Sequence, residues 1–188
     1  IVPVDFLTQI HAITFCGNFG DPILNKDLIE ILKYTTLTNP KLKIDVHTNG
    51  SARTLAFWKE LAQALPVDHC VHFGIDGLED TNHIYRTGTN FKKIMENASA
   101  FIEAGGNADW TYIIFKHNEH QVELARQYSE TVGFKEFNVK KTSRFLNRNH
   151  EYSEKLYVYN KDNTIDYTIQ LPTKLEYINQ GYSEVKFL

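Results

Sequence analysis

The sequence predicts an α/β fold: about five parallel strands with flanking helices that form a partial (β/α) barrel, followed by an antiparallel hairpin. Two observations lead to this prediction. Short β-rich runs alternate with helical segments about once every 30 residues, the spacing at which a helix links two parallel strands. The 188 residues are 42% apolar, which is enough for the core of one domain.

Four segments carry apolar residues at helical spacing and have recognisable ends. The first follows a candidate N-cap at Asn25, and the fourth is expected to be capped by Asn118 and to end at Gly133. The apolar stripes are Leu28, Ile29, Ile31 and Leu32; Leu55, Trp58, Leu61, Ala62 and Leu65; Phe91, Ile94, Met95, Ala98, Phe101 and Ile102; and Val122, Ala125, Tyr128 and Val132.

Five β-rich runs between these segments are expected to be strands: residues 12–16, 42–47, 69–75, 110–115 and 136–140. They are apolar or nearly so, as is typical of strands covered on both faces. Because one helix joins each strand to the next, the sheet should be parallel with right-handed crossovers. These elements predict a barrel domain, truncated at its N-terminus, over residues 1–150.

The last segment, residues 151–188, departs from this rhythm. Apolar residues there alternate with polar ones on both sides of a turn at residues 160–163, which predicts an antiparallel hairpin. We expect the hairpin to be an appendage that leads to a C-terminal extension outside the given chain.

Composition and charge exclude several function classes. The net charge of −3 and the pI of about 6.3 do not fit a protein that neutralises nucleic-acid phosphates. The two cysteines, Cys16 and Cys70, are far apart and indicate a reducing, cytoplasmic location. No apolar run approaches the roughly 18 residues of a membrane span, so no membrane partner is expected.

The loops after the strands are the expected location of a site, because parallel strands all end at one edge of a sheet. Three of these loops, residues 17–22, 48–51 and 74–77, combine glycine with polar residues. Taken singly, each of these loops is typical of an ordinary turn. Together they favour a ligand, because glycine allows close approach to backbone N–H groups while Asp21 and Asp76 offer acceptors for an ammonium group or ribose hydroxyls.

The order of these loop motifs resembles that of the radical S-adenosylmethionine (SAM) enzymes, especially the subgroup with a C-terminal SPASM extension. Gly20-Asp21-Pro22 is similar to the family's Gly-Glu-Pro element, Thr48-Asn49-Gly50 to its Thr-Asn-Gly, and Gly74-Ile75-Asp76-Gly77 to its Ser-x-Asp-Gly. The resemblance covers roughly residues 10–144.

The resemblance implies SAM-binding roles for these residues. Gly20, Asp21 and Pro22 would hold the SAM amino group, Asp76 would lie at the ribose, and Arg86 would bind the carboxylate through charge-assisted hydrogen bonds. Thr48, Asn49 and Gly74 complete the implied cofactor-binding set. Asp21 stands where the family has Glu, and its side chain is about one methylene shorter. Gly74 stands where the family has Ser and lacks that hydroxyl.

The implied activity is reductive cleavage of SAM at a [4Fe-4S] cluster, after which a 5′-deoxyadenosyl radical abstracts hydrogen from a substrate. The subgroup implies a peptide or protein substrate and an oxidoreductase class. The family holds its cluster with a Cys-x3-Cys-x2-Cys loop, whereas the only cysteines here are Cys16 and Cys70. We therefore expect the cluster loop and first barrel strand to lie upstream of Ile1, and this chain alone to be inactive. Without that strand one sheet edge would be unpaired, and two copies of the chain could associate there.

Other chemically interesting residues have simpler interpretations. His69 and His72 are three positions apart in a strand, so they should point to opposite faces and cannot share an ion. Cys16 has no evident Cys-His-Asn partners, and buried packing is its expected role. No His-Glu-x-x-His or Cys-x2-Cys pattern occurs.

Two other functions stay open at the sequence level. The first is a hydrolase or aldolase of the TIM-barrel type that uses Asp21, Asp76 and His47 at the strand ends. A divalent ion bound by these side chains would favour it. The second is a non-catalytic binding module that has kept the fold and lost the chemistry. Failure of the full-length protein to bind SAM would point to this second function.

Overall fold

The computed structural model describes residues 2–17, 20–145, 153–160, 162–174 and 177. The helical elements are α1 (Val4–Leu7), η1 (Pro22–Leu24), α2 (Leu28–Thr38), α3 (Leu55–Ala64), α4 (Asn82–Tyr85), α5 (Phe91–Glu103), α6 (Val122–Val132) and η2 (Ser143–Phe145). The strands are β1 (Ala12–Phe15), β2 (Lys43–Thr48), β3 (His69–Gly74), β4 (Ala108–Ile113), β5 (Glu136–Lys140), β6 (Lys155–Tyr159) and β7 (Ile165–Gln170).

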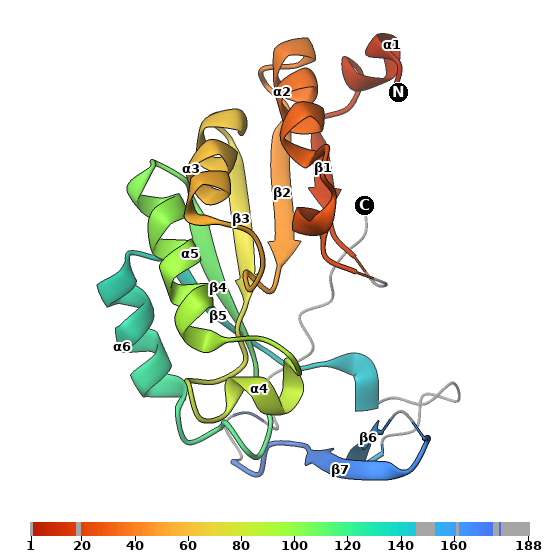
Figure 1. Cartoon of the computed structure of the whole chain (residues 1–188), viewed down its shortest axis with the longest axis vertical. Coiled ribbons are helices and arrows are strands. Elements are labelled where there is room, and N and C mark those ends of the chain that lie inside the picture. The colour runs from red at the N-terminus through yellow and green to blue at the C-terminus, as the bar shows by residue number, and fades with distance from the viewer. Residues whose placement is uncertain (1, 18–19, 146–152, 161, 175–176, 178–188) are drawn as a thin grey trace.

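Strands β1 to β5 form one parallel sheet in sequential order (Figure 1). Helices α2, α3, α5 and α6 connect the successive strands. The predicted α/β fold, with five parallel strands, flanking helices and a C-terminal hairpin, is therefore confirmed. All five strands end at the same edge of the sheet, which is the geometry that the expected site requires.

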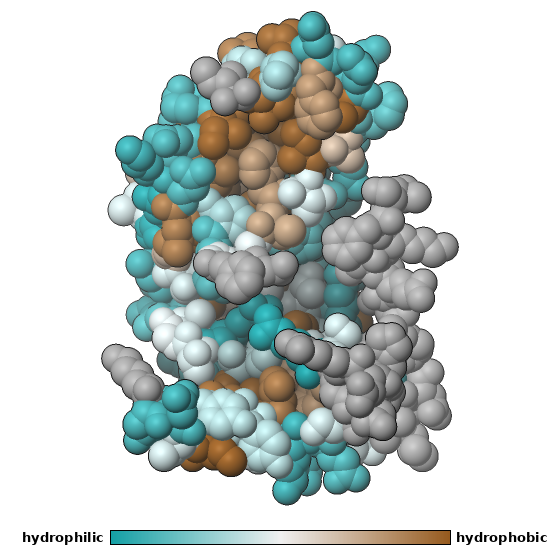
Figure 2. Space-filling model, turned by 90° about the vertical axis from the view of Figure 1, so that its right-hand side faces the viewer, coloured by the Kyte–Doolittle hydropathy of each residue, from teal (hydrophilic) through white to brown (hydrophobic). Residues whose placement is uncertain are grey.

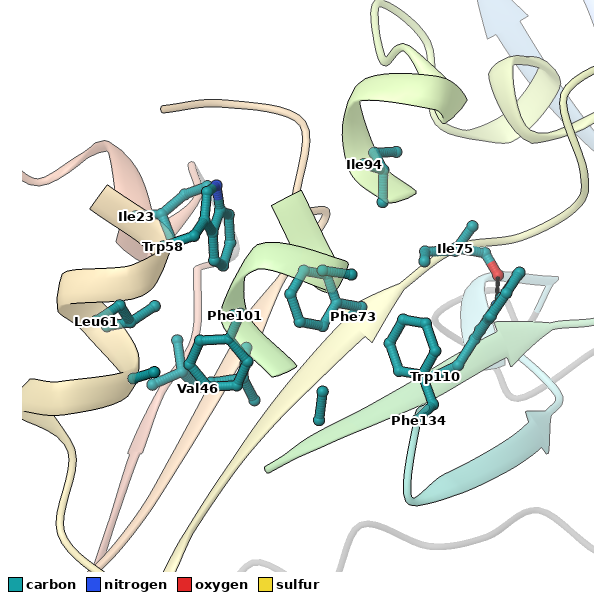
Figure 3. Close-up of a cluster of buried hydrophobic side chains, with 14 of the residues drawn as sticks. Ile23, Val46, Trp58, Leu61, Phe73, Ile75, Ile94, Phe101, Trp110 and Phe134 are labelled. Carbon is teal, nitrogen blue, oxygen red and sulfur yellow. Dashed lines mark hydrogen bonds between the residues drawn. The ribbon is translucent and has the colours of Figure 1, made fainter. Parts of the chain in front are cut away.

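One face of the sheet is buried against the helices. Val46, Phe73 and Trp110 point to this face and are fully buried. They pack with Trp58 and Phe101 from the helices, as Figure 3 shows. The indole Nε1 of Trp110 donates a 2.7 Å hydrogen bond to the carbonyl oxygen of Ile75, which satisfies the only polar atom of this buried side chain (Figure 3).

The opposite face of the sheet is polar. Burial alternates along β2 and β3, so every second residue turns away from the helices. We call this surface the polar face and define it by Asp45, His47, Cys70, His72 and Asp109. The strands were expected to be apolar or nearly so on both faces, and for β2 and β3 this was wrong: every second residue is polar and faces the inside of the partial barrel.

Two helix starts differ from the sequence prediction. Helix α2 has Asp27 as its N-cap, and Asn25 instead accepts a hydrogen bond from the Asp27 backbone N–H at 3.0 Å. Helix α6 begins after Gln121, and Asn118 instead accepts from the Phe115 N–H at 2.7 Å. That bond draws the chain into a turn, so β4 ends at Ile113, before the predicted end.

The C-terminal hairpin has the predicted form. Strands β6 and β7 pair antiparallel, with a register irregularity at Val158/Tyr159. The hairpin lies against the end of the sheet where α4 is located (Figure 1), and the Tyr167 hydroxyl donates to the Ile84 carbonyl oxygen at 2.5 Å. The expected domain boundary at residue 150 lies outside the described residues, and the division into two domains stays a prediction.

Strand β1 is an edge of the sheet, since within the described residues it pairs only with β2. Beside it, Val4 and Phe6 of α1 are 51% and 55% exposed. Figure 2 shows apolar side chains gathered over this end of the molecule. Association of two copies at this edge stays a prediction. Among the described helices, none has both the length and the apolar character to cross a membrane.

Candidate functional site

The loops after β1 and β2 meet through the carboxylate of Asp21. Its Oδ2 accepts hydrogen bonds from the Thr48 hydroxyl and from the Asn49 backbone N–H, both at 2.8 Å. Its Oδ1 accepts from the Ile23 N–H at 3.2 Å, so Asp21 is also the N-cap of η1, with Pro22 as the first helical residue. The structure thus brings the two sequence motifs together through one charged acceptor.

Asn49 and its neighbours form a tight turn at the end of β2. The Asn49 Oδ1 accepts from both the backbone N–H and the hydroxyl of Ser51, at 2.9 and 2.6 Å. Gly50 has φ of +70°, and a Cβ atom there would lie 2.6 Å from the Phe73 ring. Glycine is therefore required at this position both by its conformation and by the packing beneath the turn.

Asp76 follows β3 and is fully buried. Its Oδ2 accepts from Arg86 Nε at 2.6 Å, and its Oδ1 accepts from the Ile113 N–H at 2.5 Å. Its backbone is held as well, by Asn82 Oδ1 at the N–H and by Asn118 Nδ2 at the carbonyl, both at 2.8 Å. Burial raises the pKa of the Asp76 carboxyl, and the charge of Arg86 opposes that rise.

Arg86 lies at the end of α4 with its guanidinium over the end of β3. Nε is taken by Asp76, and the ion lies 5.3 Å from the centre of the Tyr85 ring. Within the described residues, the Nη1 and Nη2 groups of Arg86 have no hydrogen-bond partner. The side chain is 28% exposed. A guanidinium fixed on one side and open on the other suits a carboxylate ligand.

Because Gly74 has no side chain, the guanidinium of Arg86 can lie directly against it. A Cβ atom at this position would lie 2.6 Å from Nη2 of Arg86 and 3.1 Å from its Cζ. Gly74, Asp76 and Arg86 therefore form one unit in which the small residue, the buried acid and the guanidinium depend on each other. The predicted set of site residues is thus assembled as two groups at one sheet edge, one around Asp21 and one around Asp76.

Sequence reasoning missed the two asparagines that hold the Asp76 backbone. Asn82 and Asn118 are 1% and 0% exposed, and buried amides of this kind must be hydrogen-bonded. Their signal in the sequence is weak, since Asn after a strand usually indicates only a turn. Cys16 was predicted to be buried, and this was wrong: β1 ends at Phe15, and Cys16 lies exposed beyond it.

The residues proposed for a hydrolase or aldolase are not arranged as a metal site. Within the described residues, Asp21, Asp76 and His47 do not form a set of ligand atoms close enough to share an ion. His47 lies on the polar face, where its ring stacks on His72 with centroids 4.5 Å apart. As predicted, His69 points the other way and packs against Phe101.

No protein-family model and no curated protein sequence matches the chain. Solved structures with the same fold do exist, and they are radical SAM enzymes. SuiB of Streptococcus suis aligns with a TM-score of 0.61 and 16% identity over 78% of this chain and 32% of SuiB. AnSMEcpe with bound AdoMet aligns with a TM-score of 0.60 and 18% identity over 77% of this chain and 40% of that protein.

A third neighbour is a domain of a pyruvate-formate lyase-activating enzyme from Bacteroides vulgatus, with a TM-score of 0.54 and 18% identity over 70% of this chain and 80% of the domain. Identities this low establish the shared fold alone. The chain spans about a third of the length of SuiB.

Proposed function

We propose that this chain is the SAM-binding barrel part of a radical SAM enzyme. One arrangement carries the proposal. The motifs around Asp21 and Asn49 are joined at the same sheet edge at which Arg86 presents a fixed and partly free guanidinium. The fold supports it too, since neighbours with this fold include SuiB bound to S-adenosylmethionine and anSMEcpe with bound AdoMet.

The contacts suggest which atoms would hold SAM. Arg86 offers Nη1 and Nη2 to the SAM carboxylate. The carboxylate of Asp21 already accepts three hydrogen bonds from this chain, so we propose that the backbone at Gly20 and Pro22 takes the amino group. A Cβ atom at Gly20 would have no neighbour within 4 Å, which leaves room for a ligand beside this backbone.

Asp76 has a different proposed role from the one that the family resemblance implies. Both of its carboxylate oxygens are engaged inside the protein, and the side chain is fully buried. We propose that Asp76 is a positioning residue that fixes Arg86, and that the ribose is held by other groups, among them the Asn49 amide. When bound, SAM would be the source of the radical that modifies the substrate.

The residues of this chain do not fit a [4Fe-4S] cluster. Such a cluster needs several thiolates, and the only two cysteines here are separated by 53 residues of sequence: Cys16 follows β1 and Cys70 lies within β3. We propose that the cluster is held by a cysteine loop of the full-length protein.

A peptide or protein is the proposed substrate. An open cavity of about 850 Å³ is lined by His83 and Ile84 of α4, by Thr87 and Gly88, by Lys116 and His117 after β4, and by β7 of the hairpin. This cavity is large enough for several side chains of a peptide. SuiB bound to precursor peptide SuiA and anSMEcpe bound to the Cp18Cys peptide share the fold.

The test uses the full-length protein, reconstituted anaerobically with iron and sulfide. We expect absorbance near roughly 400 nm from thiolate-ligated iron and one molecule of SAM bound in calorimetry. Arg86→Ala should weaken SAM binding at least tenfold, since it removes a charge-assisted pair worth about 1.5–3 kcal/mol. Arg126→Ala, which removes an arginine on the surface of α6, should bind SAM like the wild type. A full-length sequence without clustered cysteines, or unchanged affinity in Arg86→Ala, would overturn the proposal.

A further inference from the structure

The polar face of the sheet carries three metal-ligand side chains on two neighbouring strands. Cys70 and His72 alternate along β3 and so point the same way. Asp109 on β4 is the register partner of His72. A sulfur, a ring nitrogen and a carboxylate oxygen of these residues all lie within 4.8 Å of one another. We call these three residues the Cys70 cluster.

The distances in the Cys70 cluster match those between the ligands of one tetrahedral ion. Sγ of Cys70 lies 3.8 Å from Nδ1 of His72, and the same Nδ1 lies 3.5 Å from Oδ2 of Asp109. Zinc bonds of about 2.0 Å to N or O and about 2.3 Å to S place neighbouring ligand atoms roughly 3.3–3.6 Å apart. These two distances lie within a few tenths of an ångström of that spacing, and all three donor atoms lie within 4.8 Å of one another.

A second and independent observation is an unsatisfied buried carboxylate. The Asp109 side chain is only 9% exposed, yet its Oδ1 has no hydrogen-bond partner within the described residues. Leaving such an oxygen without a partner costs free energy, so native structures rarely contain one without a bound ion, water or functional reason. A cation beside Asp109 would compensate its charge.

Asp45 extends the arrangement on the far side of the His72 ring. Its Oδ1 lies 3.7 Å from Nε2 of His72, the nitrogen that a metal at Nδ1 would leave protonated. This oxygen also has no hydrogen-bond partner within the described residues. A carboxylate behind a ligating histidine is the usual way in which proteins fix the tautomer of the ring and strengthen it as a ligand.

We propose that Cys70 Sγ, His72 Nδ1 and the Asp109 carboxylate bind one Zn²⁺ ion on the polar face, with Asp45 orienting His72. Zinc is favoured because the ligands combine sulfur, nitrogen and oxygen in a tetrahedral spacing. Binding forms the Zn–S bond and releases the Cys70 thiol proton to water. Three protein ligands leave one position for water or an anionic substrate group. His72 lies two residues before Gly74 along β3, a rise of about 7 Å, and the zinc site does not depend on SAM binding.

The test is metal binding to the 188-residue chain. We expect one equivalent of Zn²⁺ after dialysis, and with Co²⁺ a thiolate charge-transfer band in the near ultraviolet. Cys70→Ser should lose the band, Cys70→Ser and Asp109→Asn should each weaken Zn²⁺ binding at least 100-fold, and Asp45→Asn should weaken it about 10- to 100-fold. Cys16→Ser is the matched control, because it removes the other cysteine, and it should retain both binding and the band.

The wild type alone can overturn the proposal, so variants that fail to fold do not weaken the test. Less than a tenth of an equivalent of Zn²⁺ would mean that the three side chains do not form a metal site, and bound Co²⁺ without a thiolate band would mean that Cys70 is not a ligand. Loss of the band in Cys16→Ser but not in Cys70→Ser would locate the metal elsewhere. Circular dichroism of each variant identifies those whose loss of binding comes from unfolding.

Discussion

The guanidinium of Arg86 lies over Gly74 while its Nε is held by the buried carboxylate of Asp76. The glycine is therefore part of the arginine's binding site, because a Cβ atom there would meet the guanidinium. The three residues come from the end of β3, the turn after it and the end of α4. Each is needed for the guanidinium to face the sheet edge.

Gly74→Ala should disturb this arrangement through Arg86. The added Cβ would lie 2.6 Å from Nη2, so the guanidinium has to move away from Asp76. We expect SAM affinity of the full-length protein to fall about tenfold, equivalent to about 1.4 kcal/mol. The control is a double-mutant cycle with Arg86→Ala. In that background Gly74→Ala should have little further effect, because the clashing group is gone. Additive losses would show that Gly74 contacts the ligand by itself.

Asp21→Asn should lower stability even without any ligand. The amide keeps one acceptor oxygen but turns an NH₂ group toward the donors of Thr48 or Ile23. We expect the free energy of unfolding in urea to fall by about 2 kcal/mol, since hydrogen bonds to a charged group are lost. Asp27→Asn is the matched control, because Asp27 caps α2 without a side-chain hydrogen bond. Equal losses in the two variants would contradict a linking role for Asp21.

The order of elements could be predicted from the sequence because it depends on local patterns. Helical stripes, β-rich runs and the alternation after residue 153 each act within a few residues of chain. The meeting of the Asp21 and Asn49 loops followed from one further rule, that parallel strands end at the same edge. The ends of strands were harder to predict. The hydrogen bond from the Phe115 N–H to Asn118 ends β4 early, and the pattern of apolar residues does not reveal such a bond.

The finer parts of the site depend on distant partners, and so the sequence could not predict them. Arg86 reaches Asp76 only because the four-residue helix α4 turns the chain back over β3. Asn118 reaches the Asp76 carbonyl across 42 residues. The Cys70 cluster needs the register of β3 against β4, which brings His72 beside Asp109. The sequence places Cys70 and His72 on the same face of a strand, but it does not show that Asp109 lies beside them.

The stability of the chain should fall in mild acid because of His117. Its ring stacks on Phe115 with centroids 5.3 Å apart, and its buried Nε2 has no hydrogen-bond partner within the described residues. Burial, aided by the positive charges of His120 and His83, lowers the pKa of His117 from 6.5 to about 4. The unfolded chain therefore binds more protons between these values, so the stabilisation is complete above pH 6.5 and is lost as the pH falls toward 4.

His117→Phe should remove the contribution of His117 to this dependence while keeping the stack on Phe115, whereas the contribution of His47, whose pKa burial also lowers to about 4, stays in both proteins. Between pH 7 and pH 4.5 we expect the wild type to lose about 2 kcal/mol more unfolding free energy than the variant. His11→Asn, a change at an exposed histidine, should retain the wild-type dependence. Identical pH slopes in His117→Phe and the wild type would mean that His117 is solvated in the folded protein.

Glu119 should hold the segment after the hairpin onto the barrel. Its two carboxylate oxygens accept hydrogen bonds from the Thr173 N–H, the Thr173 hydroxyl and the Lys174 N–H, at 2.6, 2.5 and 3.1 Å. Because Glu119 is only 8% exposed, these charge-assisted bonds are shielded from water. Glu119→Gln can satisfy fewer of the three donors, and the segment should open more often. Amide hydrogen exchange at Thr173 and Lys174 is then expected to rise at least tenfold, while core amides of β3 stay protected.

Glu123→Gln, with a side chain that is 74% exposed on α6, should leave both amides at wild-type rates. If exchange at Thr173 is equally slow in Glu119→Gln, the segment is held by the packing of the hairpin and not by this carboxylate.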